Sequence, residues 1–296
     1  MFERYLWTKL FLVERVELEP ADLSTRHRVE LGSMANQTNA LSRTPFLTIH
    51  EQPVYFAEDW ATGIGGGLWS TGLALGQYFQ TEHAKLCIER LTQYKLSDGG
   101  VANRKISVLE LGSGNGFLSV CFLAVLASAA GKAENNAPAS VQLSELVTTD
   151  REDHLDMIRS TLFANEHIVN ILEEDGGKIY VLEHRWGEFQ LVEKDERRTT
   201  TSNLVERIRQ GRHTFDLIIG SDLAYRKDLY DPLISSLNRF SGRDTVVMIG
   251  VTMADTTPMF FQKLRENGFD YFKLADHLLE PNFRGKTFGI FILQKR

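Results

Sequence analysis

Three closely spaced glycines follow an acidic residue in the first half of the chain. The run ELGSGNG contains Glu110, Gly112, Ser113, Gly114, Asn115 and Gly116. Glycine reaches positive φ without strain and lets the backbone approach a ligand closely. The apolar residues on both sides predict a strand before the run and a helix after it, and a helix start offers free N–H groups. This pattern predicts a cofactor-binding loop.

The spacing of the glycines distinguishes between cofactors. A dinucleotide fingerprint has the form G-x-G-x-x-G, but here the third glycine comes one residue earlier and Phe117 stands in its place. The G-K-[ST] of a phosphate-binding loop is missing as well. An acid just before the first glycine, Glu110, suits a cofactor with a cationic amine. S-adenosylmethionine carries such an amine and no phosphate, so Glu110 and residues 112–116 are predicted to bind it.

Three further side chains are predicted to line the same cofactor site. Asp150 ends the apolar run LVTTD, where an acid can accept hydrogen bonds from both ribose hydroxyls. It could instead cap a helix, and Glu152 and Asp153 compete for the ribose role. Trp69 and Trp186 could stack on an adenine or wall the pocket, or they could be partly buried core residues.

Apolar runs alternate with helical patterns over most of the chain. We expect strands at residues 106–111, 143–149, 178–186, 215–223, 245–252, 269–274 and 287–293, and helices at 116–128, 153–166, 229–240 and 258–266. This alternation predicts an α/β fold with helices on both faces of a seven-stranded, Rossmann-like sheet. The link between the last two strands contains Pro281 and Gly285 and is too short for a crossover helix, so they should form a C-terminal antiparallel pair.

The chain divides into an N-terminal extension or cap, residues 1–54, and a catalytic domain, residues 55–296. Residues 128–140 are small and polar, and residues 194–211 are charged and threonine-rich. Both are predicted to be surface insertions, the second partly helical.

The glycine run resembles motif I of the class I S-adenosylmethionine-dependent methyltransferases. Other patterns are similar to the family-16 methyltransferases, which include many protein-lysine methyltransferases. They are the glycine and tryptophan segment at 62–69, the helix after it, Asn165, Trp186-Gly-Glu and Ser221-Asp222-Leu-Ala-Tyr225. The resemblance covers roughly residues 55–296, and the nearest group comprises the lysine methyltransferases of elongation factor 2. Leu182 lies earlier in the sequence than the leucine of the corresponding family motif. Residues 65–67 and 70–71 differ from the residues that are commoner at those positions in the family.

The resemblance implies methyl transfer from S-adenosylmethionine to a lysine of another protein, with a translation elongation factor as candidate substrate. A free lysine has a pKa near 10.4, so producing its neutral amine at pH 7 costs about 4–5 kcal/mol. Asp222, the family's acid at the carboxyl edge of the sheet, would orient the amine and the cofactor. Tyr225 would wall the slot and could hold the ammonium by a cation–π contact, and Ser221 would contact the cofactor. Alternatively, Asp222 caps a turn and Tyr225 lies in the core. An N-P-P-Y motif, common in amide and adenine N-methyltransferases, does not occur at this position.

Composition limits the partners of the protein. The chain has 296 residues and a formal charge of −6, which lowers the expectation of stable nucleic-acid binding. Apolar runs do not approach the roughly 18 residues that a membrane span needs. The two cysteines, Cys87 and Cys121, favour a reducing compartment, the cytoplasm or the nucleus. Scattered histidines indicate no metal site, and we expect a monomer.

Two other functions stay open. A small-molecule O- or N-methyltransferase would have a lid over its pocket, whereas a protein substrate favours an open acidic groove. A non-catalytic interaction module that kept the fold would have lost cofactor binding. A dinucleotide oxidoreductase is disfavoured by the glycine spacing.

Overall fold

A computed structural model describes residues 13–14, 44–93, 105–130, 141–188, 191, 203–211, 213–252, 255–285 and 288–296. Over these residues the chain forms an eight-stranded sheet with the strand order β1-β9-β10-β8-β7-β4-β5-β6. The strands are β1 (Val13–Glu14), β4 (Ile106–Leu111), β5 (Leu143–Asp150), β6 (Lys178–Glu183), β7 (Phe215–Ser221), β8 (Ser241–Thr252), β9 (Phe269–Leu274) and β10 (Phe288–Lys295).

The central strands are parallel and the last two are not. Strands β6, β5, β4, β7 and β8 pair in parallel, and β10 lies antiparallel between β8 and β9. This arrangement confirms the predicted α/β sheet with its C-terminal antiparallel pair. Strand β1 adds an eighth strand at the β9 edge, from the part of the chain predicted to be an extension.

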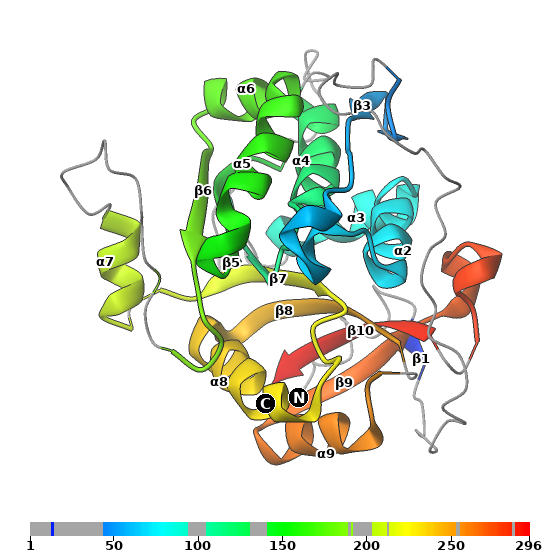
Figure 1. The fold of residues 1–296 in the computed structure, drawn as a ribbon, viewed down its shortest axis with the longest axis vertical. Helices are drawn as coiled ribbons and strands as arrows, with labels where there is room; N and C mark the ends of the chain where they lie inside the picture. Colours follow the sequence, from blue (N-terminus) through cyan, green and yellow to red (C-terminus); the bar gives the residue numbers. More distant parts are fainter. Residues whose placement is uncertain are drawn as a thin grey trace.

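Helices cover both faces of the sheet (Figure 1). One face carries α2 (Ser70–Phe79), α3 (Glu82–Gln93), α4 (Phe117–Ala130), α5 (Leu155–Ala164) and α6 (Glu166–Glu174). The other carries α7 (Asn203–Arg209), α8 (Tyr230–Phe240) and α9 (Pro258–Glu266). Each face has its own apolar core, because the side chains of a strand alternate between the two faces. Thus Val108 packs with the first set of helices and Leu109 with the second.

Short 3-10 helices occur in several of the loops. They comprise η1 (Trp60–Thr62), η2 (Ile64–Gly66), η4 (Glu152–His154), η5 (Lys227–Leu229), η6 (Asp276–Leu278) and η7 (Pro281–Phe283). Among the described residues, none of the helices is long and apolar enough to cross a membrane.

Several predicted element boundaries were wrong. The helix expected at 153–166 is split into η4, α5 and α6. The break between α5 and α6 lies at Asn165, which leaves helical geometry (φ −115°, ψ 31°) and whose side-chain Nδ2 donates to the Tyr55 carbonyl oxygen at 2.8 Å. Strand β6 ends at Glu183, so Trp186 lies in the turn that follows it. Strand β7 ends at Ser221, because Asp222 takes a positive φ of 52° that no strand residue adopts.

A small hairpin packs beside α4. Strands β2 (Leu47–Ile49) and β3 (Gln52–Val54) pair antiparallel. Phe46 and Phe56 both contact the Phe117 ring edge-on, with ring centroids 5.6 and 5.0 Å away. The domain boundary at residue 54 stays a prediction. Residues 131–140 and 194–202 of the two predicted insertions lie outside the described residues, and α7 confirms that the second is partly helical.

Candidate functional site

The three loop glycines adopt conformations that other residues rarely reach. Their φ angles are 61° at Gly112, 59° at Gly114 and 82° at Gly116. A Cβ on Gly114 would lie 2.7 Å from the Gly65 carbonyl oxygen, and one on Gly112 would lie 2.8 Å from the Trp186 ring. The loop therefore needs glycine for its conformation and for the space around it.

Backbone and side-chain hydrogen bonds hold this loop at the carboxyl ends of β4 and β5. The Gly114 N–H donates to Asp150 Oδ2 at 2.7 Å, and the Ser113 N–H donates to the Thr149 carbonyl oxygen at 2.9 Å. Asn115 Nδ2 donates to the Gly67 carbonyl oxygen at 2.9 Å. Burial raises the pKa of Asp150, although the Gly114 N–H opposes the rise. The predicted ribose-binding acid thus already contacts the predicted loop.

Glu110 lies inside the protein and not on the open side of the loop. Its carboxylate is 1% exposed and accepts hydrogen bonds from the hydroxyls of Ser113, at 2.7 Å, and Ser119. Burial raises its pKa to about 7, although both hydroxyls oppose the rise. This geometry gives Glu110 a role in holding the loop to α4, and its contact with a cofactor amine stays a prediction.

A glycine-rich segment, residues 63–69, lies over the loop. Gly65 touches both Gly114 and the ring of His154, since a Cβ on Gly65 would lie 2.4 Å from His154 Nε2. The other ring nitrogen, Nδ1, is 3.1 Å from Asp153 Oδ1 and 3.5 Å from Asp150 Oδ1. His154 therefore lies between the predicted ribose-binding acid and the covering segment, with its Nε2 buried and unpaired.

The two predicted tryptophans contact different segments, Trp69 the covering segment and Trp186 the glycine loop. Trp69 precedes α2, and its indole N–H donates to the Ile64 carbonyl oxygen at 3.0 Å. Trp186 lies against Gly112 in the turn after β6, where Gly187 has a φ of 85°. Both rings are partly buried, as a wall of a binding site requires.

Asp222 is held at the start of α2. Its Oδ2 accepts hydrogen bonds from the Thr71 hydroxyl at 2.6 Å and the Thr71 N–H at 3.1 Å. Thr71 packs on Gly250 of β8, whose carbonyl oxygen accepts the Asp222 N–H at 3.1 Å. Burial raises the pKa of Asp222 to about 6, although the Thr71 hydrogen bonds oppose the rise. The side chain of Trp69, at the N-cap position of α2, makes no capping hydrogen bond. The Asp222 carboxylate therefore caps this helix instead.

The neighbours of Asp222 differ in exposure. Ser221 ends β7 with its hydroxyl close to α2, 3.2 Å from the position of a Cβ on Gly72. Tyr225 is 41% exposed, so the alternative that it lies in the core is wrong. It stands at the surface beside the same sheet edge as the glycine loop.

The structure thus brings together the predicted residues at one edge of the sheet, with Glu110 beneath them. Sequence analysis missed Thr71, His154 and Gly65. A threonine just before an apolar helical run is a helix-start signal, which could have indicated a capping role for Thr71. The contact of Gly65 with His154 joins distant parts of the chain and leaves no local signal.

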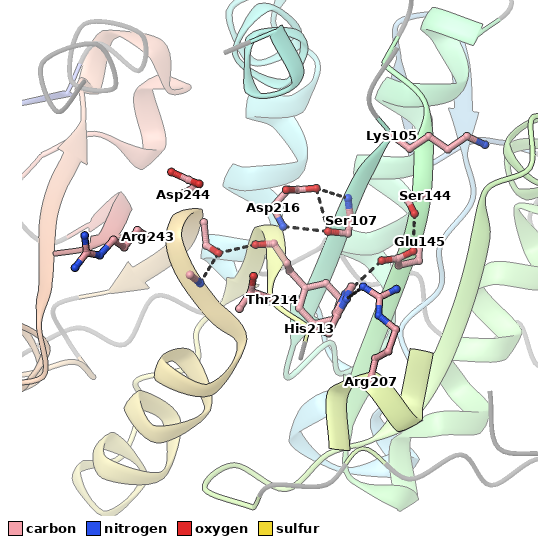
Figure 2. A pocket seen from close by; sticks show the side chains of 13 residues that line it. Lys105, Ser107, Ser144, Glu145, Arg207, His213, Thr214, Asp216, Arg243 and Asp244 are labelled. Carbon is pink, nitrogen blue, oxygen red and sulfur yellow. Dashed lines mark hydrogen bonds and ion pairs between the residues drawn. The ribbon is translucent and has the colours of Figure 1, made fainter. Parts of the chain in front are cut away.

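A pocket of about 380 Å³ opens at the opposite edge of the sheet, between the amino ends of β4, β5, β7 and β8 and helix α7 (Figure 2). Arg207 donates to His213 Nδ1 at 2.8 Å, and His213 Nε2 lies 3.3 Å from Glu145. Asp216 accepts the Ser107 N–H at 2.9 Å and the Ser107 hydroxyl at 3.0 Å. These polar groups are paired with one another, and none of the predicted site residues lines this pocket.

Comparison with known proteins identifies the family. A family model described as lysine methyltransferase, family 16, matches residues 49–267. The chain belongs to this family. Its cofactor is S-adenosylmethionine, and it is a methyltransferase.

Solved structures of other methyltransferases are also similar. The ribosomal protein L11 methylase of Lactobacillus delbrueckii subsp. bulgaricus is 18% identical over 73% of this chain and 81% of that chain, with a TM-score of 0.36. A TehB-like methyltransferase from Corynebacterium glutamicum is 13% identical over 71% and 87%, with a TM-score of 0.38. The magnesium protoporphyrin IX methyltransferase of Synechocystis, solved with S-adenosylhomocysteine, is 13% identical over 72% and 84%, with a TM-score of 0.37.

The chemistry of the loop fits S-adenosylmethionine. Cβ atoms on Gly112 and Gly114 would fill the space beside the loop, and Asp150 accepts a hydrogen bond from the loop backbone. The acidic side chains Asp150 and Asp222 suit hydroxyl and amine donors, and loop residues 112–116 contain no lysine or arginine for a phosphate. Among the parts of the chain that the structure describes, none of the clusters of histidine, cysteine and acidic residues could hold a metal ion.

Proposed function

We propose that this methyltransferase transfers the methyl group of S-adenosylmethionine to the side-chain amine of a lysine in a protein substrate. The observation that carries the proposal is the carboxylate of Asp222, held by Thr71 at the sheet edge that carries the glycine loop. The family match supports a lysine acceptor. The buried thiols of Cys87 and Cys121 are in keeping with the cytoplasm or the nucleus.

When bound, S-adenosylmethionine supplies an activated methyl group on a sulfonium. The protein then has to position the amine and favour its neutral form. With a pKa of about 6, Asp222 is a carboxylate at neutral pH and can attract the lysine ammonium. Tyr225 offers an aromatic face beside it, and an ammonium over such a face is stabilised by about 0.5–2 kcal/mol.

Loss of the ammonium proton is the costly step at neutral pH. Desolvation of the lysine between Tyr225 and the covering segment lowers the pKa of its ammonium. The proton is then transferred to solvent, which is near because Tyr225 is exposed. Gly112, Gly114 and Asp150 hold the cofactor in this proposal, with Ser221, Trp69 and Trp186 around it.

Two measurements test the proposal in sequence. Calorimetric titration with S-adenosylmethionine and, separately, with NAD should show micromolar binding of the first alone. Radiolabelled methyl transfer into cell extract should then label protein, and acid hydrolysis should recover the label as methyl-lysine. A translation elongation factor is the first purified substrate to try.

The outcomes separate the alternatives. Label in small molecules alone would support a small-molecule methyltransferase. No cofactor binding at all would support a non-catalytic module, and cofactor binding without any transfer would refute the proposed function.

A further inference from the structure

Large apolar side chains reach the surface mainly at the edge of the sheet that carries the glycine loop. Among the described residues, six such side chains are at least 40% exposed: Trp60, Ile64, Leu86, Phe163, Tyr225 and Met259. Leu86 on α3 and Phe163 on α5 lie elsewhere on the molecule. Tyr225 and Met259 follow β7 and β8, and Trp60 and Ile64 lie just before or within the segment that covers the glycine loop. We call these four side chains the apolar rim.

Trp60 and Ile64 form one side of the apolar rim. The Trp60 ring lies on Gly67 and meets the Trp69 ring edge-on, with centroids 6.0 Å apart. The Ile64 carbonyl oxygen accepts the Trp69 indole N–H. Trp69 leads directly into α2, where Thr71 holds Asp222, so these two apolar side chains lie beside the start of the helix that the candidate catalytic carboxylate caps.

Tyr225 and Met259 form the other side. Tyr225 is three residues beyond Asp222. The neighbouring Ala224 carbonyl oxygen accepts the Thr256 hydroxyl at 2.8 Å, and this bond brings the start of α9, with Met259, to the same edge. The apolar rim therefore lies on two segments that are each joined to the surroundings of Asp222, one through α2 and the other through Ala224.

The same edge is acidic. Residues 58–69, 151–154, 184–188, 222–229 and 255–257 contain eight acidic and four basic side chains. The acidic ones are Glu58, Asp59, Glu152, Asp153, Glu188, Asp222, Asp228 and Asp255, and the basic ones are Arg151, Arg185, Arg226 and Lys227. All three arginines are already paired, with Asp153, Glu183 and Asp228 respectively. The excess of negative charge at this edge favours a positively charged partner.

We infer that the apolar rim docks a protein segment in which apolar and basic side chains flank the target lysine. The inference rests on the proposed function and deepens it. Single exposed apolar residues need no explanation, but four at one edge of the sheet, two of them aromatic, match the side chains that dominate binding energy at protein interfaces. The acidic surroundings steer and select basic neighbours of the lysine.

Fluorescent 15-residue peptides with one central lysine provide the probe. One carries leucine, phenylalanine and arginine beside the lysine, and the other carries serine and glutamate at those positions. Fluorescence anisotropy with S-adenosylhomocysteine present should show at least tenfold tighter binding of the first peptide. Ile64→Ser and Trp60→Ala should each weaken that binding about tenfold, and raising the salt concentration should weaken it further.

Leu86→Ser and Phe163→Ser are the matched controls, because they remove equally exposed apolar side chains from other faces. They should change peptide affinity less than twofold, and calorimetry should give unchanged cofactor affinity for all four variants. Equal binding of the two peptides, or equal losses in rim and control variants, would overturn the inference. A lower oligomeric mass of Ile64→Ser by light scattering would also overturn it, because the rim would then join copies of this chain.

Methyl transfer into extract protein separates this inference from the proposed function. If the wild-type protein labels extract protein but shows no peptide preference, the docking inference fails and the proposed function stands. If the cofactor binds and none of the extract proteins is labelled, the proposed function itself fails.

Discussion

Asp222 accepts hydrogen bonds from both the hydroxyl and the backbone N–H of Thr71, at 2.6 and 3.1 Å, across 151 positions of sequence. The contact joins the end of β7 to the first turn of α2. One carboxylate therefore serves as the cap of a helix and is also the predicted catalytic acid. A substitution of Asp222 can therefore change both stability and turnover, and the two effects are separated by comparing different substitutions at this position.

Asp222→Asn should lower turnover at least tenfold with little loss of stability. The asparagine oxygen can still accept both Thr71 hydrogen bonds, and asparagine tolerates the positive φ of 52°, but the charge that attracts the ammonium is lost. Asp222→Ala should lose turnover and, in addition, about 1–2 kcal/mol of unfolding free energy, because the cap is removed. Steady-state rates and thermal unfolding of both variants check this. Full turnover by Asp222→Asn would refute the proposed role of the charge.

Thr71→Val should shift the pH dependence of the reaction. The Thr71 hydroxyl lowers the pKa of Asp222, which burial raises to about 6. Removing the hydroxyl should raise that pKa further, so the acidic limb of the kcat/KM profile should move to higher pH. Thr71→Ser keeps the hydroxyl and should keep the wild-type limb. Identical profiles for valine and serine would show that ionisation of Asp222 does not limit the reaction.

Gly114→Ala should abolish most cofactor affinity, and Gly268→Ala should not change it. Both glycines have positive φ, 59° and 85°, so both variants carry similar backbone strain of about 1 kcal/mol. Only at Gly114 would the new Cβ meet a neighbour, the Gly65 carbonyl oxygen at 2.7 Å, since space is open around Gly268. Calorimetry with S-adenosylmethionine compares the pair. Gly112→Arg should likewise bind no cofactor while circular dichroism shows a folded protein.

Asp150→Ala should weaken cofactor affinity about 10- to 100-fold. Charged hydrogen bonds are worth about 1.5–3 kcal/mol, and the substitution also frees the Gly114 N–H that Asp150 holds at 2.7 Å. Glu152→Ala is the control, because Glu152 competes for the ribose role in the sequence but is exposed. Calorimetry measures both variants. A larger loss in Glu152→Ala would transfer the ribose role to that residue.

The stability of the Glu110→Gln variant, relative to that of the wild-type protein, should increase as the pH rises. The pKa of Glu110 is raised in the folded protein, from 4.5 to about 7. Its contribution to stability is thus present below pH 4.5 and lost as the pH rises through 7. Glutamine does not titrate, so the unfolding free energy of the variant relative to wild type should grow by about 3 kcal/mol between pH 4.5 and 8. Urea unfolding at several pH values tests this, and a constant difference would contradict it.

The features that could be predicted from the sequence depend on neighbouring residues. Gly112, Gly114 and Gly116 could be recognised because closely spaced glycines are typical of a loop with positive φ angles. Buried strands could be recognised because they are short apolar runs. The alternation of strands and helices then limits the fold to a parallel sheet with helices on both faces. Asp150 was predictable because the end of a parallel strand lies at the ligand-binding edge.

The features that sequence analysis missed depend on distant residues. The break at Asn165 follows from hydrogen bonds to Tyr55, which lies 110 positions away. The inward orientation of Glu110 is an exception, because its partners Ser113 and Ser119 lie within nine residues of it.

By itself, the sequence determined the sheet, the glycine loop and the cofactor class, because local spacing and apolar periodicity encode them. The tertiary structure alone decided that Asp222 caps α2 through Thr71, that Gly65 covers Gly114, and that Tyr225 stays exposed beside an apolar rim. These relationships arise only when the packing of helices on the sheet brings together segments that the chain separates, since hydrogen bonding and burial depend on distance in space.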